Sequence, residues 1–421
     1  MSNVVASSPT SASPSGTRMK LILMMFLEFF IWGAWFPLVF GYLPYLKFDP
    51  SQQSLILNMF PLAALLAMFV SNQVADKLFS AEKTLAVSHL IGGLCMLGLS
   101  RTTDFVPFLI LMGLHCFFYV PTISISNAIA FNAMKDPSRE FGPVRMGGTI
   151  GWIAAAWPMF FLLPSGDKSL VTWTFVVAGI ASLVLAAFSL TLPHTPPRKG
   201  SQSEGWMAFM KAGKYLAVPC ILVLWIVTFI DAAVHQLYFS WTERFLTAVG
   251  IEQRWIMPIM SIGQIAEILT MAILGFFLSR LGWRITMILG ILGHAVRFAV
   301  FAFFPDQPAI IISVQILHGI CYAFFFATVY IFVDEYLPKD VRSSAQGLFN
   351  FMILGAGPFA ANSIAPYLHD KLYGVVDSDG LVTTHYAKLF LIPMFAGIFA
   401  AVFLAVAFWP AKRAPETVQS H

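Results

Sequence analysis

Long apolar stretches alternate with short polar segments along almost the whole chain. A stretch of about 20 mostly apolar residues can cross a bilayer as a helix, and twelve such stretches can be traced. They begin near Met19, Gln53, Thr84, Phe105, Val144 and Leu170, and then near Tyr215, Ile256, Ile285, Ala309, Ser343 and Tyr386. The pattern predicts an all-α membrane protein with twelve transmembrane helices in two six-helix halves.

The longest polar segment, Leu192 to Lys214, separates the two sets of six and is rich in proline and serine. Such a composition is typical of a linker. The predicted organisation is a disordered cytoplasmic tail at 1–18, a first half at 19–193, a cytoplasmic linker at 194–213, a second half at 214–410 and a cytoplasmic tail at 411–421. The tail at 1–18 has no apolar core, so no removable signal peptide is expected.

The composition excludes a soluble protein of this length. Hydrophobic residues make up 58% of the chain and charged residues 11%, against roughly 25% charged in a typical soluble protein. The four cysteines all lie inside apolar stretches, where they are expected to act as small packing residues. No basic patch suited to nucleic acid is present.

Basic residues in the predicted loops indicate the orientation in the membrane. Of the 25 Lys and Arg residues, 17 fall on the side shared by both termini and seven on the opposite side, while Arg297 lies within a helix. Both termini are therefore predicted to be cytoplasmic, which requires an even number of spans.

The two halves resemble each other at corresponding loops. Asp76 and Ser279 follow the second helix of their halves, 203 residues apart, and Arg145 and Arg342 open the fifth helix, 197 residues apart. Two similar halves in the same orientation are typical of transporters that alternate access around a central site. A chance likeness of short basic loops is the alternative.

Ionisable residues inside predicted spans are functional candidates, because a charge at membrane depth costs several kcal/mol. Glu28 is followed on the same helical face by Trp32 and Trp35, an arrangement suited to a proton-titrating carboxyl beside flat stacking partners. Alternatively, Glu28 is a structural residue bonded to a neighbouring helix.

Two further groups share a helical face. Gln264 and Glu267 are three residues apart, and an amide beside a carboxylate suits sugar hydroxyls or the edge of a base. Arg145, Thr149 and Trp152 follow one another at helical spacing. Glu267 could also form a structural ion pair, and Arg145 could be a positive-inside residue.

The remaining buried polar residues are interpreted more simply. Asp231 is expected to line a wet vestibule, with binding of cations or hydroxyls as the alternative. Arg297 is expected to be structural, either snorkelling or paired. Five histidines are scattered over five predicted helices, so no metal site is expected. The sequence has no nucleotide-binding loop and no catalytic cluster, so neither a cofactor nor an enzymatic activity is expected.

Several segments taken together resemble the nucleoside:proton symporters of the major facilitator superfamily. One is the loop segment Gly275 to Arg284, which is similar to a loop motif of that superfamily. The others are 28–35, 75–77, 119–122, 144–151, 259–267, 295–299 and 342–347. The resemblance covers the chain from about Leu21 to Pro410.

The resemblance implies a central cavity that binds a nucleoside and carries it inward with a proton. The substrate-binding residues that it implies, together with the tryptophans noted above, are Trp32, Trp35, Arg145, Thr149, Trp152, Gln236, Gln264, Glu267, His318 and Tyr322. Relatives can have an aspartate in the tenth helix where this chain has Ala323, and a polar residue where it has Phe239. With Ala323 at that position, the predicted proton-coupling residues are Glu28 and Glu267.

The expected function is proton-coupled nucleoside import across the cell (inner) membrane by alternating access. The expected partners are a nucleoside, a proton and the lipid bilayer, with no nucleic acid, and the protein is expected to be a monomer. Two alternatives stay open: a facilitator of another small polar solute such as a sugar, and a membrane sensor that binds a nucleoside without transporting it.

Overall fold

The computed structural model describes residues 14–70, 79–164, 166–196, 212–338, 341–372, 374–376, 382–384 and 386–410. Within these ranges the chain is helical apart from short connections and one hairpin. The segment 75–77, which includes Asp76, lies outside the described residues. So do residues 197–211 of the predicted linker and the tails at 1–13 and 411–421.

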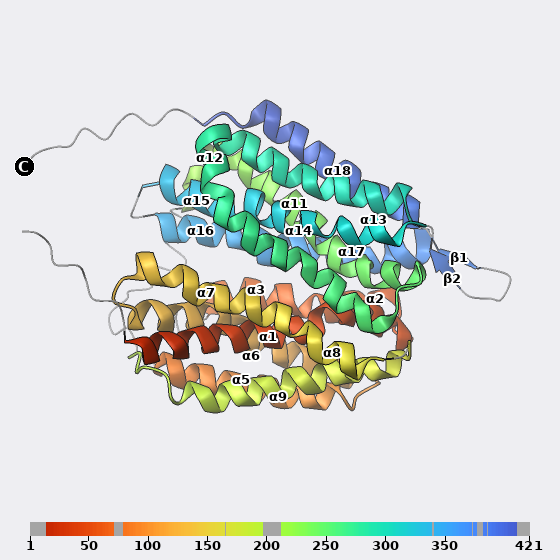
Figure 1. Cartoon of the computed structure of the whole chain (residues 1–421), viewed down its shortest axis with the longest axis horizontal. Coiled ribbons are helices and arrows are strands. Elements are labelled where there is room, and N and C mark those ends of the chain that lie inside the picture. The colour runs from red at the N-terminus through yellow and green to blue at the C-terminus, as the bar shows by residue number, and fades with distance from the viewer. Residues whose placement is uncertain are drawn as a thin grey trace, which may run out of the picture.

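The first half of the chain forms one helical bundle, coloured red to yellow-green in Figure 1. Its helix α1 lies in contact with α6, α7 and α9. The elements are α1 (Ser15–Tyr45), α2 (Pro50–Leu57), α3 (Met59–Val70), α5 (Ala81–Leu99), α6 (Phe105–Ala133), α7 (Pro137–Ala154), α8 (Ala156–Leu162), η1 (Lys168–Val171) and α9 (Thr172–Ser189).

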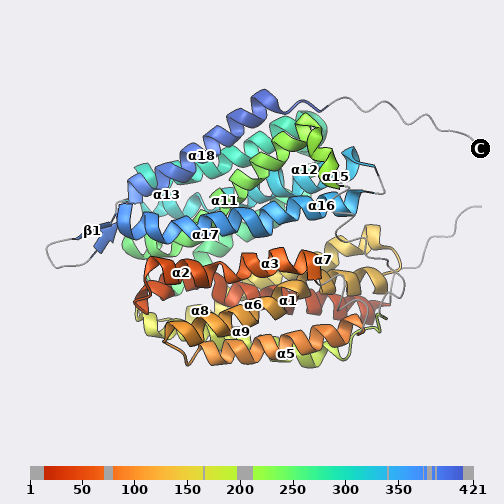
Figure 2. The ribbon, with the colours of Figure 1, turned by 180° about the vertical axis from the view of Figure 1, so that it is seen from behind.

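The second half forms the other bundle, coloured green to blue and seen from behind in Figure 2. Its helical elements are η2 (Lys214–Ala217), α11 (Pro219–Ala248), α12 (Gln253–Phe303), α13 (Pro308–Ser313), α14 (Ile316–Cys321), η3 (Tyr322–Ala327), α15 (Thr328–Tyr336), α16 (Arg342–Asn350), η4 (Phe351–Ala356), α17 (Gly357–Tyr367), η5 (Leu368–Leu372) and α18 (Tyr386–Ala407). A short antiparallel hairpin of β1 (Gly374–Val376) and β2 (Val382–Thr384) precedes α18.

Eight described helical stretches are long and apolar enough to cross a membrane. One of them, α12, covers two predicted spans, because Gly282 with φ 69° breaks the helix. Helices α2 and α3 together cover another predicted span, as do α7 and α8, while α5 alone covers a further one. The all-α membrane fold is confirmed, and the total of twelve spans stays a prediction.

The predicted starts of the spans fall in or close to described helices. The largest difference is at the fifth span, which begins at Pro137 rather than near Val144. Proline is favoured in the first turn of a helix, where its missing N–H is not needed. Figures 1 and 2 show that α1 begins and α18 ends at the same end of the molecule, as an even number of passes requires.

Helices α1 and α7 pack closely because glycines face the α1 backbone. A Cβ on Gly151 would lie 2.0 Å from the carbonyl oxygen of Phe26, and a Cβ on Gly147 would lie 2.7 Å from that of Ile22. Such small-xxx-small spacing is a common means of close helix approach in membranes. This packing fixes α7, and therefore its polar residues, against the first helix.

Candidate functional site

Charged and phenolic groups from both halves meet between the two bundles. Arg145 on α7 interacts electrostatically with Glu267 on α12 and with Tyr322 in η3. The Arg145 guanidinium also lies over the ring of Phe29, with its Cζ 4.0 Å from the ring centroid. This grouping brings a basic side chain of the first half near a carboxyl group of the second.

An aromatic wall lies beside this charged group. The rings of Trp32 and Phe60 are stacked, with centroids 4.7 Å apart. Those of Trp32 and Trp152 are packed edge to face, with centroids 5.2 Å apart. The ring of Phe239, from the second half, packs against Trp152 and Phe36, with its centroid 6.3 Å and 5.2 Å from theirs. The buried indole N–H of Trp32 has no hydrogen-bond partner among the described residues, so it could donate to a ligand.

Two other predicted site residues occupy different surroundings. Trp35 is buried in the first bundle, where its ring meets the ring of His115 at 5.8 Å. Gln236 is buried and donates from Nε2 to Oδ1 of Asn362 on α17 at 2.9 Å. Asn362 in turn donates to the carbonyl oxygen of Leu57 in the first half at 3.0 Å, so Gln236 belongs to a chain of contacts between the halves.

The remaining predicted site residues lie on the same helices as this group. Gln264 is buried, and its Oε1 has no partner among the described residues. Thr149 is half-buried, one turn beyond Arg145 on α7. The π-helical turn η3, which contains Tyr322 and Ala323, is a rare local geometry that recurs at functional sites.

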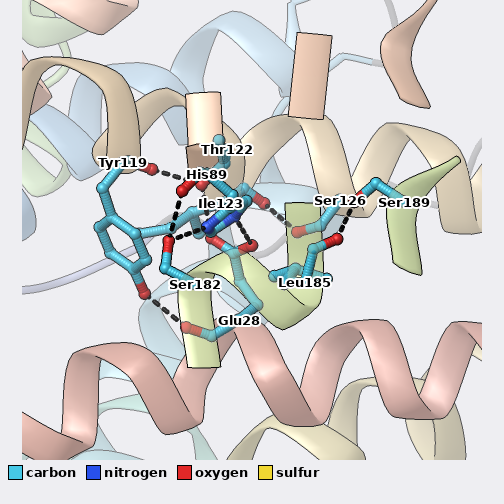
Figure 3. A network of polar contacts seen from close by, with 9 residues as sticks. All are labelled: Glu28, His89, Tyr119, Thr122, Ile123, Ser126, Ser182, Leu185 and Ser189. Carbon is cyan, nitrogen blue, oxygen red and sulfur yellow. Dashed lines mark hydrogen bonds and ion pairs between the residues drawn. The ribbon is translucent and has the colours of Figure 1, made fainter. Parts of the chain in front are cut away.

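Glu28 lies inside the first bundle, fully buried and fully hydrogen-bonded (Figure 3). Its Oε2 lies 2.9 Å from Nε2 of His89, and its Oε1 accepts from the hydroxyl of Thr122 at 2.6 Å. The hydroxyl of Tyr119 donates to its backbone carbonyl at 2.6 Å. The carboxylate therefore faces α5 and α6, not the aromatic wall or Glu267.

A second buried polar cluster lies inside the other bundle. Arg297 is fully buried and donates from Nη1 to Nδ1 of His318 and from Nη2 to Nδ1 of His294, both at 2.9 Å. Its Cζ lies 4.0 Å from the ring centroid of Tyr238. Arg297 is therefore paired rather than snorkelling.

The prediction that Asp231 lines a wet vestibule is wrong. Its side chain is fully buried, with Oδ2 3.6 Å from Nε2 of His294. The three histidines that the sequence scatters over separate helices converge here, since the ring of His235 lies 4.8 Å from that of His318 and 5.5 Å from that of His294. Among the described residues, no group of side chains could hold a metal ion.

Polar contacts join the two halves near the end of α1. Arg244 on α11 donates to the carbonyl oxygen of Phe40 from Nε at 3.1 Å and from Nη2 at 2.6 Å, and to Oε1 of Gln53 at 3.1 Å. We call this set the Arg244 bridge. Beside it, Lys168 pairs with Glu243, and Gly41 leaves room for that carboxylate, because a Cβ there would overlap it.

Replacing Arg244 with alanine is expected to open this end of the molecule. Hydrogen bonds from a charged group contribute about 1.5–3 kcal/mol each, so the opening equilibrium should rise by at least about tenfold. The measurement is the rate at which a thiol reagent labels Ser54→Cys in purified protein, since Ser54 is buried between the halves beside Ser363. The four native cysteines are buried.

Arg254→Ala is the matched control, because Arg254 is paired with Glu252 on the surface of the second half. An equal labelling rate in the Arg244 and Arg254 variants would show that the bridge does not hold the halves together.

Some residues become important only through contacts between distant parts of the chain. Phe36, Phe60 and Phe239 complete the aromatic wall, but the chain has 41 phenylalanines, and nothing in the local sequence distinguishes these three. Glu243 and Arg244 lie at a predicted helix end, where charged residues are ordinary. Their side chains reach the first half only because α1 and α11 lie side by side.

Comparison with known proteins places these features in context. Residues 15–413 match the family described as Nucleoside H+ symporter. The nucleoside permease NupG of Escherichia coli (strain K12) is 27% identical over 96% of this chain and 99% of its own length. The xanthosine permease of the same organism is 27% identical over 93% of this chain and 94% of its own. The crystal structure of NupG superposes with a TM-score of 0.81 at 26% identity, covering 93% of this chain and 99% of that one.

Proposed function

This chain belongs to the nucleoside H+ symporter family, and from that premise we propose how its residues bind a nucleoside and couple it to a proton. Its fold is that of the major facilitator superfamily, its function is proton-coupled nucleoside import, and it is a multi-pass membrane protein. The observation that carries the proposal is that Arg145 and Glu267, which come from opposite halves, lie near enough to interact electrostatically.

In the proposed site, Glu267 and Gln264 bind the ribose. A carboxylate with two oxygens suits a vicinal diol, and Oε1 of Gln264 has no partner among the described residues. Trp32 and Trp152 cover the base, because their rings contact each other and Trp152 contacts Phe239 of the other half. Tyr322 and Thr149 complete the site. Trp35 and His318 pack against Phe36 and Phe239 of the aromatic wall, and Gln236 bonds to Asn362, so these three residues position the site.

Glu267 is one of the two carboxylates proposed to couple transport to a proton. Arg145 favours the ionised form of Glu267 while the halves are close, since an opposite charge nearby stabilises a carboxylate. When the halves separate, that stabilisation is lost and the carboxylate can take up a proton.

Glu28 is the other, and its hydrogen bonds support the proposal. Ser182 donates its hydroxyl proton to the carbonyl oxygen of His89 at 2.8 Å, so it can only accept from Nδ1 of that histidine. The contact between Nε2 of His89 and Oε2 of Glu28 then needs a further proton, on one atom or the other. The two side chains therefore hold one proton between them, inside the first bundle.

We further propose that the protein works as a monomer with both termini in the cytoplasm, and that it has no catalytic activity. The basic residues of the loops support the orientation. With it, the Arg244 bridge closes the outer side of the transporter.

Uptake of radiolabelled uridine by purified protein in liposomes tests the proposal. We expect accumulation that needs an inwardly directed proton gradient and is inhibited by unlabelled nucleosides but not by sugars. Inhibition by sugars would favour a facilitator of another polar solute. Nucleoside binding without flux would favour a sensor.

A further inference from the structure

The two buried clusters correspond to each other through the repeat of the chain. Glu28 and Asp231 lie 203 residues apart, as do His115 and His318, and His89 and His294 lie 205 apart. The carboxylates lie on α1 and α11, which begin their halves. His89 and His294 lie on α5 and α12, and His115 and His318 lie on α6 and α14. Each bundle thus encloses a carboxylate facing a histidine.

The two carboxylates differ in their hydrogen bonds. Both oxygens of Glu28 have partners, at 2.9 Å and 2.6 Å. Neither oxygen of Asp231 has a hydrogen-bond partner among the described residues, although Oδ2 lies 3.6 Å from Nε2 of His294. A buried carboxylate without donors is unfavourable as an anion and is relieved by taking a proton.

The hydrogen bonds of Arg297 restrict where a proton can be added to His294 and His318. A guanidinium only donates hydrogen bonds, so Nδ1 of His294 and Nδ1 of His318 must both accept from it. Both imidazoles are thereby held neutral, with their own protons on Nε2. A further proton cannot enter at Nδ1 of either ring without breaking a bond to Arg297. Of the facing pair Asp231 and His294, the carboxylate is therefore the member that can accept it.

We propose that Asp231 is a proton-binding site of the transport cycle, linked to the nucleoside site through His294, Arg297 and His318. The inference rests on the proposed function, to which it adds a residue that binds the transported proton apart from the nucleoside. The proton adds to a carboxylate oxygen of Asp231, gives a neutral carboxylic acid, and leaves from the same oxygen after the halves have rearranged.

The surroundings allow such a link. Titratable groups surround Asp231 and Arg297 from three elements: His235 and Tyr238 on α11, His294 on α12, and His318 and Cys321 on α14. The ring of His318 lies 5.6 Å from that of Phe239 in the aromatic wall.

Protonation of Asp231 removes the negative charge that balances Arg297. The loss of that charge changes the electrostatic environment of the Arg297 guanidinium, and with it the strength of its hydrogen bond to His318. A change in the charge of Asp231 is therefore passed through Arg297 and His318 to Phe239, which belongs to the aromatic wall of the nucleoside site.

Asp231→Asn tests the proposal by separating proton movement from nucleoside movement. Wild-type proteoliposomes are expected to make the external medium more alkaline when uridine is added, and also to exchange internal for external uridine. The variant should lose the alkalinisation by tenfold or more and keep the exchange. Retained alkalinisation would overturn the proposal. Loss of exchange as well, in folded protein, would also overturn it, because Asp231 would then be needed for binding or structure.

Two further variants keep the test decisive. Glu82→Gln is the control, because Glu82 is a buried carboxylate of the first half, bonded to His194 and to the backbone N–H of Thr195. It belongs neither to the Asp231 cluster nor to the nucleoside site, so its variant should behave as wild type. If Asp231→Asn does not fold, Asp231→Glu restores a carboxylate and should restore the alkalinisation; its failure to do so in folded protein would overturn the proposal. If wild-type protein exchanges uridine without alkalinisation, the coupling itself fails and Asp231 has no proton to bind.

Discussion

Replacing Glu267 with glutamine is expected to abolish accumulation of uridine or adenosine while leaving the amount of protein in the membrane unchanged. The carboxylate has two proposed partners, Arg145 in one half and the ribose hydroxyls of the nucleoside. Each hydrogen bond from a ribose hydroxyl to the charged carboxylate contributes about 1.5–3 kcal/mol, so its loss lowers the affinity by roughly tenfold or more. Uptake into proteoliposomes with an imposed proton gradient measures the effect.

Glu252→Gln is the matched control for this substitution. Glu252 immediately precedes the same helix, α12, but its side chain is 59% exposed and pairs with Arg254 on the surface. Its variant should accumulate nucleoside like the wild type. If the Glu267 variant also did so, both the ribose-binding and the proton-coupling roles of Glu267 would be excluded.

Replacing Gly151 with alanine is expected to damage both stability and transport. The added Cβ would lie 2.0 Å from the backbone carbonyl of Phe26, and a backbone atom cannot move aside as a side chain can. Overpacking of this kind typically costs about 1–3 kcal/mol, occasionally more. Because α7 also carries Arg145 and Trp152, its displacement from α1 should reduce nucleoside uptake. Thermal unfolding in detergent and uptake into liposomes are the measurements.

Gly142→Ala makes the same change on the same helix where nothing lies within 4 Å of the added atom. Alanine is favoured over glycine in a helix by up to about 1 kcal/mol, so this variant should unfold at the same temperature or higher. A similar loss of stability in both variants would mean that helix propensity, not the contact with α1, explains the effect.

The residues of the candidate site were predicted unevenly. Arg145 and Glu267 could be found from sequence because charge inside an apolar span is costly and therefore conspicuous. Glu28 was conspicuous for the same reason, yet its placement inside the first bundle depends on His89 and Thr122, which lie about 60 and 95 residues further along the chain. The role of Asp231 was misjudged because its burial is decided by the helices packed around it.

By itself the sequence determined the membrane-spanning helical fold, its division into halves and the polar residues that the bilayer would otherwise exclude. These follow from hydropathy, which is a local property of about 20 consecutive residues. Only the tertiary structure decided which of those polar residues come near one another: Arg145 and Glu267 across the halves, Glu28 and His89 in one bundle, and Arg297 and two histidines in the other. Such pairings depend on which faces of distant helices meet, and the order of residues along one helix does not contain that information.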